Sequence, residues 1–499
     1  MRLVVSLVCL ALLATPLAAQ ADWRMASSEN FVIYADDSEA EIKRFAEKLE
    51  RYRSAMGYAF PSTNFVPSPS NRVVIYVVGS GKLVKKLYGE GSRYIGGFYV
   101  PRAGGSIAII PPVDPSARGY VSPSERTLMH EYAHHFMYEN APYVVPRWFG
   151  EGLAEYFSTA KFEMDGAVGL GLPNEARAYE IGAARNITIE ELLDSKAYAA
   201  RTSTAYDNFY GRSWLLFHYV YSDQARRKQL VDYLTRLNRG EPELDSAIAA
   251  FGDLKKLDRD LKKYLGQRKW QYIKVPSDVL SVGAIEVTTL NEAEAASMAV
   301  RVQSRSGVDA EEAATVVLEA RALATTWPDE SEVQAALAEA EYDAGNDEAA
   351  IAAADKALLG NASHINALLQ KGYALMRIAT ETGSADAWKA TRSHFVAMNK
   401  IEPDHPVPLL YFYLSFVGQG EAPSKNAVTG LEWALQLAPY DPGLRMTVAQ
   451  QQVNEKRYAE AIATLGPLAY SGHASEENPA LKLLEEAKRA MAEEPAVVE

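Results

Sequence analysis

The sequence predicts an α+β domain followed by an all-α repeat domain, and three observations support this division. Short β-branched and aromatic runs are concentrated before about residue 112, whereas helical spacing of apolar residues dominates after Ser124. Beyond about residue 288 the chain is rich in Ala and Glu, and helical patterns recur every ~34–40 residues. A chain of 499 residues also exceeds the roughly 250–300 residues that one hydrophobic core supports.

Residues 1–21 have the pattern of a secretory signal peptide. Arg2 precedes a mainly apolar run from Leu3 to Leu13, and small residues follow up to Ala21. The run is shorter than the ~20 residues that span a bilayer, so we expect cleavage, export to the periplasm or the medium, and no stable membrane span afterwards. Cys9, the single cysteine, lies within this leader, which excludes cysteine catalysis and cysteine-ligated zinc in the mature chain.

The balance of charged residues limits the kinds of molecule that the protein is expected to bind. There are 51 Lys and Arg against 64 Asp and Glu, so the formal net charge is −13, and removal of the leader with Arg2 would make it −14. Nucleic-acid binding needs a basic surface, so this balance argues against a nucleic-acid partner. Hydrophobic residues make up 48% and charged residues 23%, which is typical of a globular protein.

The first domain, expected over residues 22–275, has a small mixed sheet and then a helical subdomain. Strands are predicted at 30–35, 72–78, 94–100 and 106–111, and helices at 38–56, 125–139, 148–161, 188–195, 209–221 and within 228–263. We expect strand 106–111 to form the edge of a cleft where an extended peptide could pair. The long Gly- and Ala-rich segment 161–208 is expected to cover part of this cleft.

The run Leu128-Met129-His130-Glu131-Tyr132-Ala133-His134 contains the pattern H-E-x-x-H. On a helix, His130 and His134 project from one face and can bind a single Zn²⁺. Glu131 lies where its carboxylate can reach a water molecule on that ion. His135 is expected only to pack or to face solvent.

A second helix beginning near Trp148 would bring Glu151 back towards the two histidines. Two His and one Glu make a catalytic zinc site with an open fourth position. Glu155 lies one turn further along the same face, where it can accept the remaining N–H of a ligand histidine. Trp148 and Trp214 are expected to pack beneath the site, and His218 is expected to be a core histidine.

H-E-x-x-H followed by W-x-x-E-G-L-A-E-Y resembles the gluzincin metallopeptidases, most closely the peptidase-MA-like domain family, and is similar to a W-x-N-E-G-F-A segment of aminopeptidase-N-type enzymes. The resemblance covers residues 30–221. It implies one Zn²⁺ per chain, held by His130, His134 and Glu151, with Glu131 as general base. Tyr210 begins a segment resembling the helix start that supplies a transition-state tyrosine in the aminopeptidases.

No G-x-M-E-N segment precedes the motif, and in the aminopeptidases its acidic residue binds the free amino group of the substrate. The sequence therefore favours a zinc endopeptidase with a peptide or protein substrate over an exopeptidase. The alternative is an inactive protease-like domain on a repeat scaffold that acts as a protein-binding adaptor.

Residues 289–490 resemble a tetratricopeptide array, connected to the first domain by a linker at 276–288 and followed by an acidic tail at 491–499. Small and large residues fit the repeat spacing in one copy at Leu337, Ala338, Gly345, Ala350, Ala357 and Leu358. Further copies are indicated near 372–403, 431–439 and 448–466. A plain helical bundle is the alternative. An array would present a concave surface to a protein partner or to the substrate.

Overall fold

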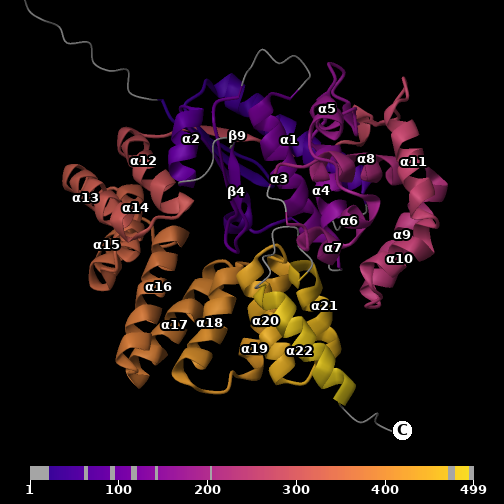
Figure 1. The fold of residues 1–499 in the computed structure, drawn as a ribbon. Coiled ribbons are helices and arrows are strands. Elements are labelled where there is room, and N and C mark those ends of the chain that lie inside the picture. Colours follow the sequence, from indigo (N-terminus) through magenta and orange to yellow (C-terminus); the bar gives the residue numbers. More distant parts are fainter. Residues whose placement is uncertain are drawn as a thin grey trace, which may run out of the picture.

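The computed structural model describes residues 22–60, 66–89, 96–113, 121–140, 144–202, 205–469 and 478–493. The expected signal peptide at 1–21, with Cys9, lies outside this range. No helix within the described residues is both long and apolar enough to cross a membrane. Figure 1 shows the sheet and its covering helices in indigo and magenta, with the later helices forming an arc below them in orange and yellow.

A six-stranded mixed sheet organises the first domain. Its order is β4-β5-β3-β2-β1-β9, and the strands are β1 (Arg24–Ser27), β2 (Phe31–Ala35), β3 (Val73–Val77), β4 (Phe98–Val100), β5 (Ile107–Ile110) and β9 (Glu286–Thr289). The β2–β3 and β3–β5 pairs are parallel. The helices α1 (Glu39–Ala59) and α2 (Gly81–Tyr88) lie between these strands in the chain. All four predicted strands are therefore present, whereas β1 and β9 were not predicted.

Two expectations about this sheet are wrong. The predicted strand 106–111 corresponds to β5, which is internal because both β3 and β4 pair with it. The edge strand is β4, which pairs with β5 alone among the described strands. The predicted linker 276–288 is also partly structured, with a 3₁₀ turn η2 (Ser277–Val279) and the beginning of β9, which pairs with β1.

The helical subdomain follows the sheet. Its elements are α3 (Pro123–Asn140), α4 (Arg147–Phe157), α8 (Phe209–Tyr221), α9 (Gln224–Asn238), α10 (Glu243–Phe251) and α11 (Leu254–Leu265). Residues 161–208 form β6 (Lys161–Phe162), β7 (Val168–Leu170), α5 (Glu175–Ala183), α6 (Ile189–Leu193) and α7 (Ser195–Ala199), and β8 (Ile273–Val275) completes a three-stranded sheet with β6 and β7. One continuous apolar core joins the large sheet, α1, α3, α4 and α8.

Paired helices make up the C-terminal region. They are α12 (Glu292–Ser306), α13 (Ala310–Thr326), α14 (Ser331–Asp343), α15 (Asp347–Gly360), α16 (Ile365–Thr382), α17 (Ala385–Ile401), α18 (Pro406–Gln419), α19 (Lys425–Leu437), α20 (Pro442–Asn454), α21 (Tyr458–Ala469) and α22 (Pro479–Glu493). The pairs from α14 to α21 begin 34 to 41 residues apart. This repeat of helix pairs confirms the helical array. The predicted acidic tail begins within α22, and residues 494–499 lie outside the described range.

Buried polar contacts attach the array to the first domain. Glu402 accepts hydrogen bonds from the Ser70 backbone N–H (3.0 Å) and hydroxyl (2.8 Å). The Tyr440 hydroxyl donates to Asn71 Oδ1 (3.0 Å), and Asp441 accepts from the Ala103 N–H (2.6 Å). Since unsatisfied buried polar groups are costly, these contacts favour one docked position of the repeats. Figure 1 shows the result, with α20 and α21 beneath the helices of the first domain.

Candidate metal centre

The helix that carries H-E-x-x-H begins with a reciprocal cap. The Ser122 hydroxyl accepts from the Glu125 backbone N–H (3.3 Å), and the Ser122 N–H donates to the Glu125 carboxylate (2.7 Å). Pro123 follows at the first helical position, where its missing N–H costs nothing. Leu128, Met129, Tyr132, Ala133, Phe136 and Met137 bury one side of α3. His130 and His134 lie one turn apart on the stripe of α3 that faces α4.

Three side chains from α3 and α4 converge on one point. Nε2 of His130 and Nε2 of His134 lie 3.2 Å apart, and each lies 3.5 Å from Oε2 of Glu151. Four ligands arranged tetrahedrally at 2.0–2.1 Å from zinc would be about 3.3 Å from one another. The triangle of donor atoms therefore has the dimensions of three corners of a zinc coordination sphere. The two nitrogens and the carboxylate oxygen are also the donor types that zinc prefers.

Close packing of α4 on α8 fixes the position of Glu151. A Cβ atom on Gly152 would lie 2.4 Å from the Ser213 carbonyl oxygen and 2.7 Å from the Phe217 Cβ. Glycine at this position therefore allows the two helices to approach, and Glu151 beside it is directed to α3. As expected, Trp148 and Trp214 are buried on these two helices.

Glu155 contacts the first histidine from one helical turn beyond Glu151. Its Oε1 lies 3.3 Å from Nδ1 of His130 and accepts from Arg177 Nη2 at 2.6 Å. Asn174 donates to the other carboxylate oxygen at 2.9 Å. Burial opposes the charged form of Glu155, but the hydrogen bonds and charges of His130 and Arg177 lower its pKa to about 2. An ionised Glu155 favours a proton on Nδ1 of His130, which would make Nε2 the nitrogen available to a metal ion.

The pKa shifts of His130 and Glu151 show how strongly these groups interact. Burial lowers the pKa of His130, yet its hydrogen bonds to Glu151 and Glu155 outweigh burial and raise the pKa well above its usual value. Burial likewise opposes ionisation of Glu151, but His130 and His134 hold the pKa of its carboxyl well below the usual range. A proton on the His130 imidazole offsets part of the negative charge of the two buried carboxylates. A divalent cation could take over that role.

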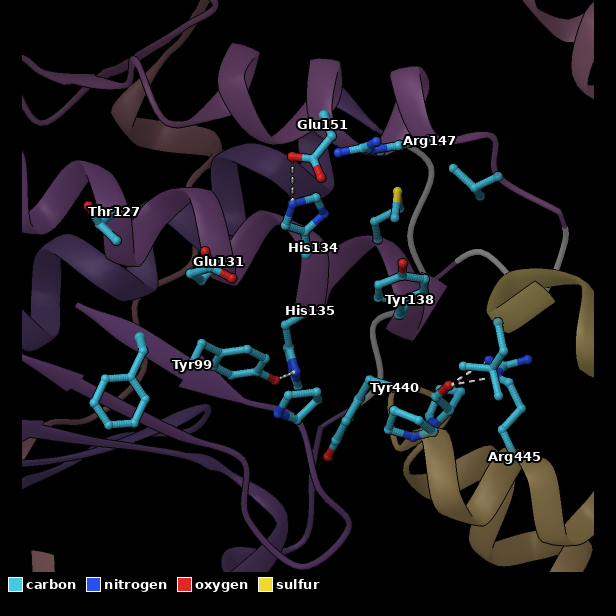
Figure 2. Close-up of a pocket in the computed structure, with 18 of the residues that line it drawn as sticks. Tyr99, Thr127, Glu131, His134, His135, Tyr138, Arg147, Glu151, Tyr440 and Arg445 are labelled. Carbon is cyan, nitrogen blue, oxygen red and sulfur yellow. Dashed lines mark hydrogen bonds and ion pairs between the residues drawn. The ribbon is translucent and has the colours of Figure 1, made fainter. Parts of the chain in front are cut away.

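The site opens into a cavity of about 590 Å³. Glu131, His134 and Glu151 line it, and β4 contributes Phe98 and Tyr99. The opposite wall comes from the repeat array, at Pro439, Tyr440, Pro442, Arg445 and Leu468. Figure 2 shows His134 and Glu151 on one side of the cavity and Tyr440 and Arg445, from the repeats, on the other. None of the described residues of this segment, 161–202 and 205–208, lines the cavity, so this part of it does not cover the cavity as expected.

Tyr210 is near the site but not in the cavity lining. It is the second residue of α8 and half-buried, and the Arg177 guanidinium lies 5.0 Å from the centre of its ring. Burial and the charge of Glu151 raise the pKa of Tyr210 to about 12, while a hydrogen bond to Arg147 opposes this shift. Among the described residues, Arg147 lines the cavity whereas Tyr210 and His130 do not.

The remaining histidines of interest have structural partners. His135 is buried, its Nδ1 lies 2.5 Å from the Tyr99 hydroxyl, and its ring centre lies 4.2 Å from that of Tyr440. Burial lowers its pKa to about 3, so it is neutral and packs as expected. His218 is fully buried, with Nδ1 2.9 Å from the Tyr264 hydroxyl and Nε2 3.0 Å from the Gly171 carbonyl. The prediction of a core histidine is confirmed.

Several residues around the site were missed by the sequence analysis. Arg177 and Asn174 orient Glu155 from α5 and from the residue before it, and neither carries a motif. Arg147 could have been suspected, since it lies one helical turn before Glu151 on α4. Arg445 and Tyr440 gave no signal, because only the docking of the repeats brings them to the cavity.

Known proteins match this chain only in parts. A sequence family described as "Protein of unknown function (DUF1570)" matches residues 125–243, a stretch that includes every predicted site residue. No curated protein matches the chain. Solved tetratricopeptide-repeat structures are similar to part of it, among them a thermophilic repeat protein, TTC0263 from Thermus thermophilus, with 15% identity, a TM-score of 0.32, and 40% of this chain and 100% of that chain covered.

Two further solved structures are also similar to part of this chain, again with low identity and low TM-scores. PilF from Pseudomonas aeruginosa has 15% identity and a TM-score of 0.32, with 40% of this chain and 90% of that chain covered. A tetratricopeptide repeat protein from Parabacteroides merdae has 12% identity and a TM-score of 0.30, with 55% and 95% covered. Because these TM-scores are low, the description of the repeats rests on the helix pairs of this chain.

Proposed function

We propose that this protein is an exported zinc endopeptidase of the gluzincin type. The observation that carries the proposal is the triangle of His130 Nε2, His134 Nε2 and Glu151 Oε2, with sides of 3.2, 3.5 and 3.5 Å, at the wall of a cavity of about 590 Å³. When bound there, zinc supplies Lewis acidity that polarises a scissile carbonyl and acidifies water.

Three other side chains have proposed roles in hydrolysis. Glu131 lines the cavity next to the ligand His130, where its carboxylate would take a proton from the attacking water and later deliver it to the leaving amine. Glu155, held by Arg177, fixes the orientation of the His130 ring. Tyr210 is the candidate donor to the developing oxyanion, because its hydroxyl pairs with Arg147 at the cavity wall.

The position of β4 at the end of the sheet supports action within a peptide chain. The edge strand β4 contributes Phe98 and Tyr99 to the cavity, and among the described strands it pairs with β5 alone. An extended substrate could pair with its outer edge and pass the metal ligands without presenting a chain end. We therefore assign to β4 the pairing with substrate that the sequence suggested for strand 106–111.

A digest of a peptide library by the full chain tests the proposal. The zinc-loaded protein should cleave internal bonds, and chelation should stop cleavage until zinc is restored. Glu131→Gln should retain zinc but lose at least ~100-fold in rate, since a general base contributes about 10²–10⁴-fold. Glu319→Gln, an exposed change on α13, is the matched control and should cleave normally. Full activity of Glu131→Gln would refute the base assignment.

The helical repeats support a second candidate, a protein-binding scaffold whose protease-like domain is inactive. Arrays of helix pairs offer extended surfaces to protein partners. Under this alternative, the purified chain would capture a partner whether or not zinc is present, and it would cleave no peptide at any zinc concentration. A partner that is cut after capture would instead favour the endopeptidase, with the repeats acting in substrate binding.

A further inference from the structure

The charge of the cavity differs from that of the chain as a whole. The protein carries a net charge of −13, yet the cavity wall has only two carboxylates among its described residues, Glu131 and Glu151. Both belong to the proposed zinc site. The other fully charged side chains of the wall are Arg147, from α4, and Arg445, from α20 of the repeats. Away from the proposed zinc site, the fully charged side chains among the described residues of the wall are therefore both cations, set among apolar and aromatic residues.

Arg445 is a buried cation held in one position. It is 4% exposed, and its Nε, Nη1 and Nη2 donate to the carbonyls of Pro439 (3.1 Å), Thr464 (3.2 Å) and Pro439 (2.5 Å). These bonds leave two of the five guanidinium N–H donors. Within the described part of the chain no carboxylate forms an ion pair with it, and burial lowers its pKa to about 10. A buried charge without a counter-ion is costly, so a partner from outside the chain would be stabilising.

Arg147 supplies a second cation on the α4 side of the same cavity. Its guanidinium carbon lies 4.3 Å from the ring centre of Phe209 and 4.8 Å from that of Tyr198. Its Nε is buried and has no hydrogen-bond partner among the described residues. Figure 2 shows Arg147 beside Glu151, with Tyr138 between these residues and the repeat wall that carries Arg445.

We propose that this cavity binds a carboxylate of the substrate, with Arg445 and Arg147 as specificity-determining residues. A planar guanidinium with two free donors matches a carboxylate in shape and charge. Tyr138 and Tyr440, on opposite walls, would enclose the aliphatic part of such a group. The repeat array thus contributes a substrate subsite next to the zinc site. The role of this subsite in catalysis rests on the proposed function. Binding of a carboxylate there requires no metal.

Two sources can provide this carboxylate, an acidic side chain or the C-terminus of a peptide. Three fluorescein-labelled nonapeptides with a common sequence distinguish them: one with Glu at a scanned position and a C-terminal amide, one with Gln there and an amide, and one with Gln and a free C-terminus. Binding is measured by anisotropy, with chelator-treated full-length protein and with Glu131→Gln. We expect one carboxylate peptide to bind about 10- to 100-fold more tightly than the neutral one. Added salt should reduce this preference.

Variants assign the preference to the arginines. Arg445→Gln and Arg147→Gln should each reduce it, and Arg445→Lys should retain part of it because the charge is kept. Arg489→Gln, an exposed change on α22, should leave it intact. Equal affinity for all three peptides at every scanned position would overturn the proposal. It would also be overturned if a folded Arg147→Gln/Arg445→Gln double variant kept the full preference.

The two proposals fail in different ways. Zinc-dependent cleavage without any preference for carboxylate peptides would overturn the subsite and leave the endopeptidase. Carboxylate-dependent binding without zinc uptake or cleavage would overturn the endopeptidase and leave the subsite. A preference for the free C-terminus alone would support the subsite and change the proposed cleavage from internal bonds to the chain end.

Discussion

Glu155 Oε1 lies 3.3 Å from His130 Nδ1, on the side of the ring opposite the nitrogen that faces Glu151. This contact explains why two glutamates one turn apart on α4 meet the same histidine from different sides. It also predicts that Glu155 matters for metal affinity although it would not touch the metal.

Glu155→Gln should weaken zinc binding about 10- to 100-fold, because it removes the charge that keeps the His130 proton on Nδ1. Competition with a zinc-binding dye measures this directly. Arg177→Met should cause a smaller loss, since it removes the ion pair that holds Glu155 but leaves the Glu155 carboxylate in place. An unchanged zinc affinity in Glu155→Gln would contradict the orienting role.

Gly152→Ala should destabilise the first domain by about 1–3 kcal/mol, because the new methyl group would meet the Ser213 carbonyl at 2.4 Å. Urea unfolding followed by tryptophan fluorescence provides the measurement. Gly182→Ala is the matched control: nothing lies within 4 Å of its Cβ position on α5, and alanine there should be stabilising by about 0.5–1 kcal/mol. Equal effects of the two substitutions would contradict the close approach of α4 and α8.

Glu402→Ala should loosen the repeats from the first domain, because the partly buried N–H and hydroxyl of Ser70 would lose their acceptor at a cost of about 1 kcal/mol. Faster hydrogen exchange at Ser70 and Asn71, with helix content unchanged, is the expected result. Asp404→Ala, two residues further along and exposed, should exchange like the parent protein. Identical exchange in Glu402→Ala would argue against a fixed docking of the array.

The ion pairs of Glu332 predict a pH dependence of stability within the repeats. Burial opposes its charge, but His364 and Arg301 lower its pKa to about 2 from a usual 4.5. When folding lowers the pKa of a carboxyl group, its charge stabilises the folded state at pH values above the unfolded-state pKa. This stabilisation is lost as the pH falls through the folded-state pKa. Glu332→Gln should therefore cost about 1 kcal/mol near pH 6, a value reduced because the side chain is 34% exposed.

That cost should shrink as the pH falls from about 4.5 towards 2, where both proteins carry a neutral group. Denaturant unfolding at several pH values follows the difference, with the exposed Glu330→Gln as control. A difference that grows on acidification would reverse the assigned sign.

The candidate ligand set and most of the fold were predictable because they depend on local pattern. On any helix, residues four apart project from the same face. This rule places His130 and His134 together on α3, and Glu151 and Glu155 together on α4. Strands β2, β3 and β5 were predictable as β-branched runs. By contrast, β9 adds to the sheet from about 260 residues away along the chain, and Glu286–Thr289 has little apolar character to reveal it.

The part of the cavity wall that the repeats supply was also not predictable, because it depends on contacts between residues far apart in sequence. Arg445 and Tyr440 reach the site through docking contacts such as Tyr440 with Asn71, which join residues far apart in sequence and follow no period. The described residues of 161–208 do not cover the cleft, because a high content of Gly and Ala does not determine where a segment packs. Those residues form helices and strands that support Glu155 through Asn174 and Arg177 instead.

Titration of zinc into chelator-treated full-length protein, with metal content measured after gel filtration, tests the central claim most directly. We expect one tightly bound zinc per chain, lost in His134→Ala and in Glu151→Ala and retained in Glu319→Gln. A folded parent chain that binds no zinc, or one whose zinc survives the loss of both His134 and Glu151, would contradict it.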